Sequence, residues 1–207
     1  MSCHARARRF HASLTLGGAF ALAVAAEPCT AQAHVSTAVD SLRHIQEMSP
    51  TYGPVGTRVE ISTLNLPVQA KVHVGYGATR TGFEALMEVP QGMWGDIAAD
   101  LTVPPDAPWD RAIVFVAFNA IFSPIGLSDP FHVVNDEGLI RRTGRITDEA
   151  SGCLTMRDQD GYLYALTGDL GDADVGDEVV IDGTYAPTGS CLEGSTIGVV
   201  RVGPVGG

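Results

Sequence analysis

The chain has 207 residues, with 13 Lys plus Arg against 24 Asp plus Glu, which gives a formal net charge of −11. This acidic balance excludes nucleic acid and anionic lipid surfaces as main partners, because both require a basic face on the protein. The length allows one large domain or two small ones.

The N-terminus has the pattern of a secretory signal peptide. Three arginines precede an apolar run of thirteen residues at 14–26, and Ala31-Gln32-Ala33 fits a small-x-small cleavage site. A run of this length is too short for a membrane-spanning helix, which needs roughly 20 apolar residues. We therefore expect a signal peptide at 1–33, with cleavage after Ala26 as the alternative. The mature protein would be secreted or periplasmic and would have no membrane span.

Cleavage after residue 33 leaves Cys153 and Cys191 as the cysteines of the mature chain. Exported compartments oxidise thiols, and no His or Asp cluster lies close in sequence to either residue. We expect a disulfide between them, and neither a metal site nor a nucleophile. The mature chain carries ten Arg plus Lys against twenty-three Asp plus Glu, so its net charge is −13 and nucleic acid is again disfavoured.

Residues 34–47 have partial helical spacing of apolar side chains and are interpreted as a linker or a short helix. The following segment, 48–135, alternates apolar and polar residues with the period of two that is typical of strands. Its predicted strands are separated by turn-forming residues and lie at 57–63, 70–77, 83–89, 96–103, 112–118 and 129–134. Short strands at this spacing predict a β-sandwich.

Three motifs in this segment resemble the IPT/TIG family of immunoglobulin-like domains. They are SPTYGPVGTRVEI at 49–61, VPPDAP at 103–108 and DPFHVV at 129–134, and the resemblance covers about 46–135. It implies an Ig-like β-sandwich that acts as a spacer or recognition module with no active site of its own. The chain departs from the family at 62–67, where STLNLP replaces a Gly-rich stretch.

The second half, 137–203, has five Arg against twelve Asp plus Glu, and five strand-like runs that suit a small OB-like barrel. The predicted fold class is therefore all-β: an Ig-like β-sandwich followed by a small five-stranded OB-like barrel. A Cys before the second strand, an Asp-Gly hairpin, a Gly-Asp-x-Val turn and a late Cys resemble a bacterial family of unknown function. That resemblance implies a fold and a disulfide only.

An acidic stretch at 158–179 contains seven carboxylates, and the sequence leaves two interpretations of them. A calcium loop of the EF-hand type would require a regular series of oxygen ligands, which is missing here. Asp158-Gln159-Asp160-Gly161 has instead the composition of a hairpin turn. We interpret these residues as turn carboxylates and expect no metal and no cofactor.

No catalytic motif is present: the chain has no GxSxG elbow, HExxH pair, P-loop or dinucleotide fingerprint. His73 and His132 lie in predicted strands without a Ser, Cys or Glu pattern beside them. We therefore expect no catalytic residues and no enzyme activity, while an enzyme with a dispersed site is the third alternative.

Trp94 and Trp109 fall in predicted turns, where a ring can stack on a sugar or anchor a partner. The alternative is that both rings fold back onto the sandwich. On the barrel, Arg157, Tyr162 and Tyr164 form a candidate ligand-binding face. The sequence favours an interaction or spacer protein whose partner is a protein or glycan at the cell envelope. A carbohydrate-binding protein is the second alternative.

Overall fold

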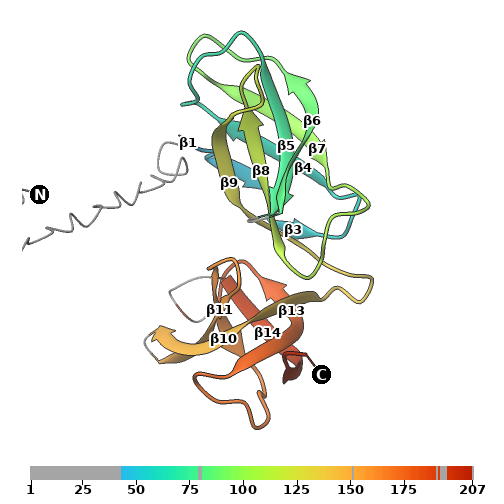
Figure 1. Ribbon diagram of the computed structural model, residues 1–207, viewed down its shortest axis with the longest axis vertical. Helices are drawn as coiled ribbons and strands as arrows, with labels where there is room; N and C mark the ends of the chain where they lie inside the picture. The colour runs from blue at the N-terminus through green and yellow to red at the C-terminus, as the bar shows by residue number, and fades with distance from the viewer. Residues whose placement is uncertain (1–42, 79–80, 151, 190, 192–194, 207) are drawn as a thin grey trace, which may run out of the picture. The chain divides into compact units, whose positions relative to one another are not determined.

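The computed structural model describes residues 43–78, 81–150, 152–189, 191 and 195–206, and its regular structure there consists of strands (Figure 1). The predicted signal peptide and residues 34–42 lie outside this part of the chain. The described residues belong to one compact unit. The expected all-β fold, a sandwich followed by a small barrel, is confirmed.

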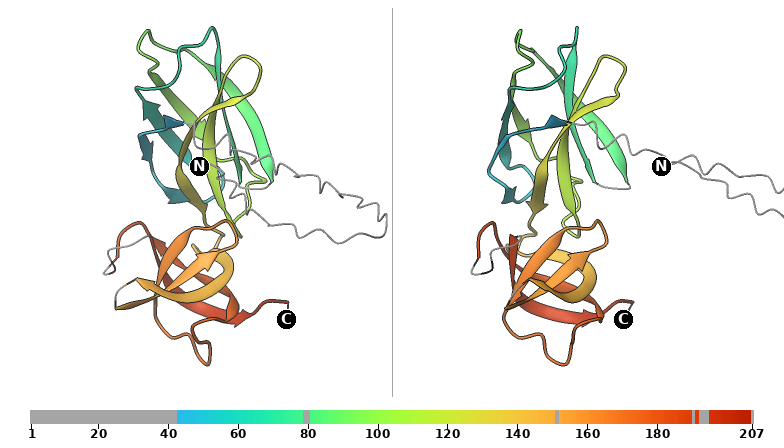
Figure 2. Two further views of the ribbon diagram at one scale, coloured as in Figure 1. Left: turned by 60° about the vertical axis from the view of Figure 1, so that its left-hand side comes forward. Right: turned by 90° about the vertical axis from the view of Figure 1, so that its left-hand side faces the viewer.

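The sandwich is built from nine strands in two sheets. They are β1 (Arg43–His44), β2 (Glu47–Ser49), β3 (Tyr52–Gly53), β4 (Arg58–Thr63), β5 (Val72–Ala78), β6 (Gly82–Val89), β7 (Ile97–Thr102), β8 (Ala112–Phe118) and β9 (Pro124–Val133). One sheet has the order β1-β9-β8-β5-β6, with β3 also on β9, and the other has the order β2-β4-β7. Figure 2 (right) shows the two sheets as separate layers.

Alternation of side chains along the strands produces the core between these layers. Val59 and Ile61 of β4 face Phe115 of β8 and Phe131 of β9, and all four side chains are at most 2% exposed. The rings of Phe115 and Phe131 meet edge to face, with centroids 5.9 Å apart. The polar residues between them in β4 are partly or fully exposed, as a half-buried strand requires.

The beginning of the sandwich differs from the expectation of a linker or short helix at 34–47. Residues 43–44 and 47–49 are strands, and Ile45 between them is 1% exposed in the core. The Ile45 N–H donates to the carbonyl of Leu127, 2.7 Å away, which ties this segment to β9. Strands of two or three residues are too short to show a period, so the sequence did not reveal them.

The barrel consists of β10 (Ile140–Ala150), β11 (Cys153–Asp158), β12 (Leu163–Thr167), β13 (Glu178–Ala186) and β14 (Ser195–Pro204). These strands close in the order β10-β11-β12-β14-β13, with β12 and β14 parallel and the other pairs antiparallel. This is the five-stranded arrangement expected for an OB-like barrel. Its core contains Ile146, Met156, Ile181 and Ile197, each with no exposed surface.

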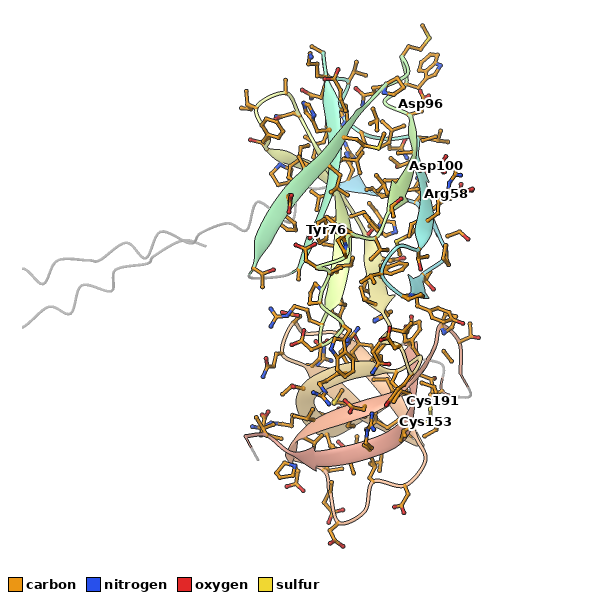
Figure 3. The ribbon with its side chains drawn as sticks, turned by 90° about the vertical axis from the view of Figure 1, so that its right-hand side faces the viewer. Arg58, Tyr76, Asp96, Asp100, Cys153 and Cys191 are labelled. Carbon is orange, nitrogen blue, oxygen red and sulfur yellow. A yellow bond between two sulfur atoms is a disulfide. The ribbon has the colours of Figure 1, made fainter. Side chains whose placement is uncertain are left out.

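The Cys153–Cys191 disulfide is present, and it joins the first residue of β11 to the connection between β13 and β14 (Figure 3). The two Cα atoms are 6.3 Å apart, within the normal range for a disulfide. Cys191 is 8% exposed, so the bridge lies against the barrel.

Candidate functional site

Three connections lie at one end of the sandwich: 64–71 between β4 and β5, 90–96 between β6 and β7, and 119–123 between β8 and β9. Strand register places them together, because Thr63 pairs with Ile97 and His73 pairs with Phe118. Figure 1 shows all three at the same end of the sheets. We call these three connections the apolar loop end.

Met93 and Trp94 occupy the two corner positions of a β-turn. The Gly95 N–H donates to the Gly92 carbonyl, 3.1 Å away, which closes the turn. Gly95 has a φ of +78°, and a Cβ at this position would collide with the carbonyl of Leu66, so glycine is required here. Turn corners usually carry Gly, Pro, Asn, Asp or Ser, and turn geometry gives no reason for a methionine and a tryptophan.

A second turn places Ile121 in the same kind of position. The Phe122 N–H donates to the Asn119 carbonyl at 3.0 Å, and the Asn119 side-chain oxygen accepts the N–H groups of Ile121 and Ser123. Phe122 has a φ of +58°, a conformation that costs a bulky residue about 1–3 kcal/mol. Its ring stacks on His73, with centroids 4.7 Å apart.

Side chains of the connection at 64–71 alternate between the core and the solvent. Leu66 is 3% exposed and packs in the core, whereas its neighbours Leu64 and Val68 are more than 60% exposed. The Leu66 N–H donates to the Gly95 carbonyl at 3.2 Å, so the first two connections are hydrogen-bonded to each other. The buried leucine therefore anchors a loop whose outward positions are apolar.

The apolar loop end holds the six most exposed large apolar side chains in the described part of the chain. Their exposed fractions run from 57% to 80%, and they are Leu64, Val68, Met93, Trp94, Ile121 and Phe122. Charged residues within the three connections are limited to Lys71 and Asp96, each the last residue of its connection. Lys71 is paired with Glu88, 3.1 Å away. Exposed apolar side chains that gather in this way are a common feature of interaction sites.

Trp94 also borders a hollow of about 380 Å³. The other residues that line this hollow are mostly polar: Arg43, His44, Gln46, Asn65 and Leu66. An aromatic ring beside side chains that can form hydrogen bonds is a combination suited to a sugar.

Trp109 lies at the opposite end of the sandwich from Trp94. It precedes the first residue of β8, whereas the last residue of β8 borders the apolar loop end. The Trp109 ring is partly buried against the core, and the Arg141 guanidinium lies over it, 4.6 Å from the ring centroid. The two tryptophans therefore do not share a binding face.

The predicted barrel face of Arg157, Tyr162 and Tyr164 is not formed as expected. Tyr164 is 1% exposed and belongs to the barrel core, and Tyr162 packs against the same core. Arg157 forms an ion pair with Glu149 and donates to the Gly161 carbonyl at 2.8 Å. Tyr164 pairs with Met156 of β11, and both side chains point into the barrel core, whereas Arg157, the next residue of β11, lies on the outer face.

The outer face of β2, β4 and β7 carries a larger hollow of about 600 Å³. Its lining consists of small, acidic and other polar side chains with Met48 and Ile61, and contains no aromatic ring. Arg58 and Asp100 form an ion pair on the neighbouring strands β4 and β7 (Figure 3). Both side chains are about half exposed or more, so the pair contributes little to stability.

The acidic stretch at 158–179 consists of the turn between β11 and β12, strand β12, and the connection that leads into β13. The Asp158 side-chain oxygen accepts the N–H groups of Asp160 and Tyr162, at 3.0 and 2.8 Å, in the β11–β12 hairpin. Asp169 accepts the Gly171 N–H in the same way, at 2.8 Å. In the part of the chain that the structure describes, no group of three His, Cys, Asp or Glu side chains is placed to hold a metal ion.

A buried polar network surrounds Arg142, which is 1% exposed. Its guanidinium donates to the Tyr164 hydroxyl at 3.2 Å, to the Trp109 carbonyl at 3.1 Å and to His132 Nδ1 at 2.7 Å. The Tyr164 hydroxyl in turn donates to Asp158, 3.3 Å away. Burial raises the pKa of Tyr164 and of Asp158.

His132 is the neutral member of this network. Burial, and then the positive charge of Arg142, hold the pKa of His132 well below its ordinary value of 6.5. Arginine always donates, so His132 Nδ1 accepts and the ring proton lies on Nε2. That Nε2 is buried and has no hydrogen-bond partner among the described residues.

The depressed pKa of His132 predicts a loss of stability in mild acid. The unfolded chain takes up a proton below pH 6.5 and the folded chain does not, so the free energy of unfolding falls as pH decreases below that value. The limiting slope is about 1.4 kcal/mol per pH unit. Urea unfolding between pH 7 and 5 measures this slope, which His132→Gln should reduce.

Asp158 acts in the opposite direction, because its raised pKa favours the folded state as pH falls. The slope is therefore read as the difference between wild type and His132→Gln. His73→Gln is the control, since His73 lies in a strand but is only half-buried. An equal slope in wild type and His132→Gln would contradict the assignment.

In the comparisons with known proteins, only the barrel has a match. A family model described as a protein of unknown function (DUF5818) matches residues 143–205, which span the barrel from within β10 to the end of β14. No curated protein and no solved structure matches the chain. Among the described residues, no helix is long and apolar enough to cross a membrane.

Proposed function

We propose that this chain is a secreted or periplasmic, non-catalytic interaction protein that binds its partner through the apolar loop end. The observation that carries the proposal is the gathering of the six most exposed large apolar side chains in three adjacent connections. The resemblance of 46–135 to IPT/TIG domains supports a recognition role, because loops on a rigid sandwich commonly carry binding residues.

In this proposal the barrel is a closed, acidic domain that carries no binding or catalytic site. Four of its five arginines form ion pairs with carboxylates, and these are Arg141, Arg145, Arg157 and Arg201. The residues with strongly shifted pKa values, His132 and Tyr164, are buried around Arg142. The hollow beside Arg142 and Asp158 measures only about 50 Å³, which supports the non-catalytic part of the proposal.

A sedimentation assay with washed bacterial envelopes tests the role of the apolar loop end. The double variant Trp94→Ser/Ile121→Ser is expected to bind at least about tenfold more weakly than wild type, because each position loses a large apolar contact. Serine suits turn corners, so stability should change by no more than about 0.5 kcal/mol.

The matched control is Val175→Ser/Val200→Ser, which alters two barrel residues that are 50% and 56% exposed. Its binding should equal that of wild type. An equal loss of envelope binding in the two double variants would contradict the proposal, and so would unchanged binding of the Trp94→Ser/Ile121→Ser protein.

Carbohydrate binding is the second candidate, and the hollow beside Trp94 favours it. Asn65 offers an exposed amide there that can pair with sugar hydroxyl groups. If a glycan is the ligand, Asn65→Ala and Trp94→Ser should both abolish binding to envelope oligosaccharides in calorimetry, while Ile121→Ser should not. Loss of binding in Ile121→Ser alone would exclude this candidate.

A further inference from the structure

The apolar loop end consists of projecting turns. Met93, Trp94 and Ile121 occupy turn corners and are each more than 75% exposed. The hollow beside Trp94 is lined mostly by polar residues, so it is not an apolar pocket that would receive a partner's side chain. The partner must therefore supply the apolar environment into which these protruding side chains insert.

The chemistry of these side chains favours a lipid interface. Tryptophan and phenylalanine favour the boundary between lipid headgroups and acyl chains, and apolar side chains reach roughly 5–10 Å into it. No charged residue lies between the two ends of any of the three connections, so insertion would not require a charge to leave water. Arg43 and Lys71 border the apolar loop end, where headgroups would lie.

A second copy of the chain fits this surface less well. Two projecting ends would touch mainly at their turn corners, whereas a stable interface usually buries about 800 Å² on each partner. A fluid bilayer conforms to separate projections and needs no matching surface. The net charge of −13 on the mature chain disfavours anionic lipids and is compatible with zwitterionic ones.

We propose that the apolar loop end inserts into the interfacial zone of a zwitterionic lipid bilayer, with Trp94, Met93 and Ile121 as the inserted side chains. This inference rests on the proposed function and names the partner of the same surface.

Tryptophan fluorescence tests the proposal directly, because Trp94 and Trp109 are the two tryptophans of the chain. In Trp109→Phe, addition of phosphatidylcholine vesicles should shift the Trp94 emission to the blue, and brominated phosphatidylcholine should quench it. In Trp94→Phe, the remaining Trp109 should show neither change. If Trp109→Phe fails to fold, the difference between wild type and Trp94→Phe gives the same answer.

Vesicle partitioning supplies the second measurement. Ile121→Ser should lower the partition coefficient roughly 10- to 100-fold, and Val200→Ser should leave it unchanged. Vesicles of phosphatidylglycerol should bind more weakly than phosphatidylcholine at low salt, with a smaller difference at high salt.

Two results would overturn the inference. Absence of a blue shift and of partitioning, with envelope binding still lost in Trp94→Ser/Ile121→Ser, would assign the surface to a protein or glycan and leave the proposed function intact. Self-association of wild type that disappears in this double variant, without vesicle binding, would assign it to a second copy. Unchanged envelope binding in the same variant would refute the proposed function itself.

Discussion

Replacing Arg142 by alanine is expected to lower the free energy of unfolding by about 3–5 kcal/mol. The substitution leaves a cavity at a side chain that is 1% exposed, and it removes the donor to His132 Nδ1, 2.7 Å away. It also removes a positive charge that interacts with the buried carboxylate of Asp158. Urea unfolding at pH 7, followed by circular dichroism, measures the change.

Two further variants separate the effect of the cavity from the effect of the lost hydrogen bonds. Arg142→Met retains most of the side-chain volume and should cost about 2–3 kcal/mol, because the acceptors are still left without a donor. Arg145→Ala is the matched control, since Arg145 belongs to the same strand and its ion pair with Glu178 is exposed, so the loss should stay below about 1 kcal/mol. A loss for Arg142→Ala as small as that for Arg145→Ala would contradict a stabilising role for the network.

The fold was largely predictable because most strands are long enough to show a period. In β4 and β5 the alternation of valine and isoleucine with polar residues is visible in the sequence, and both strands lie within about two residues of their predicted positions. The strands at 43–44, 47–49 and 52–53 were not predicted, because they contain too few residues for any pattern. The positions of β1 and β3 depend on pairing with β9, which is distant in sequence, and the position of β2 depends on pairing with β4.

The candidate site was predicted only in part. Trp94 was expected in a turn and is 78% exposed there, but the sequence did not connect it with Ile121 or Val68. A signal was present at 62–67, where the chain departs from the resemblance described in the sequence analysis, and this segment overlaps the connection at 64–71. The joint exposure of three connections depends on strand register, and one-dimensional patterns do not contain it.

The buried network was also beyond sequence reasoning. Arg142 has the pattern of an ordinary strand residue, and the sequence placed Tyr164 on an outer face. Arg142 is buried because β10 turns this side chain inward, where His132 and Tyr164 supply partners 10 and 22 residues away. A charge can be buried only where such partners exist, and these partners come from other strands.

Removal of the disulfide is expected to cost about 4 kcal/mol. The bridge closes a loop of 38 residues that contains β12 and β13, and without it the unfolded chain gains the entropy of that loop. In the folded barrel, the connection between β13 and β14 also loses its covalent attachment to β11. Urea unfolding of Cys153→Ser/Cys191→Ser measures the loss. Each single variant should lose a similar amount of unfolding free energy.

Reduction of the wild-type protein supplies the control for this loss. Reduced wild type and the double serine variant should unfold at the same urea concentration, because both lack the same cross-link while only one has altered side chains. If reduction lowers the free energy of unfolding by less than the two serine substitutions do, part of the effect of the substitutions comes from altered packing around Cys191, which is 8% exposed. In the mature protein that starts at residue 34, thiols that react after unfolding without reduction would contradict the bridge. The connection between β13 and β14 would then be held to the barrel by strand pairing and packing, without a covalent bond.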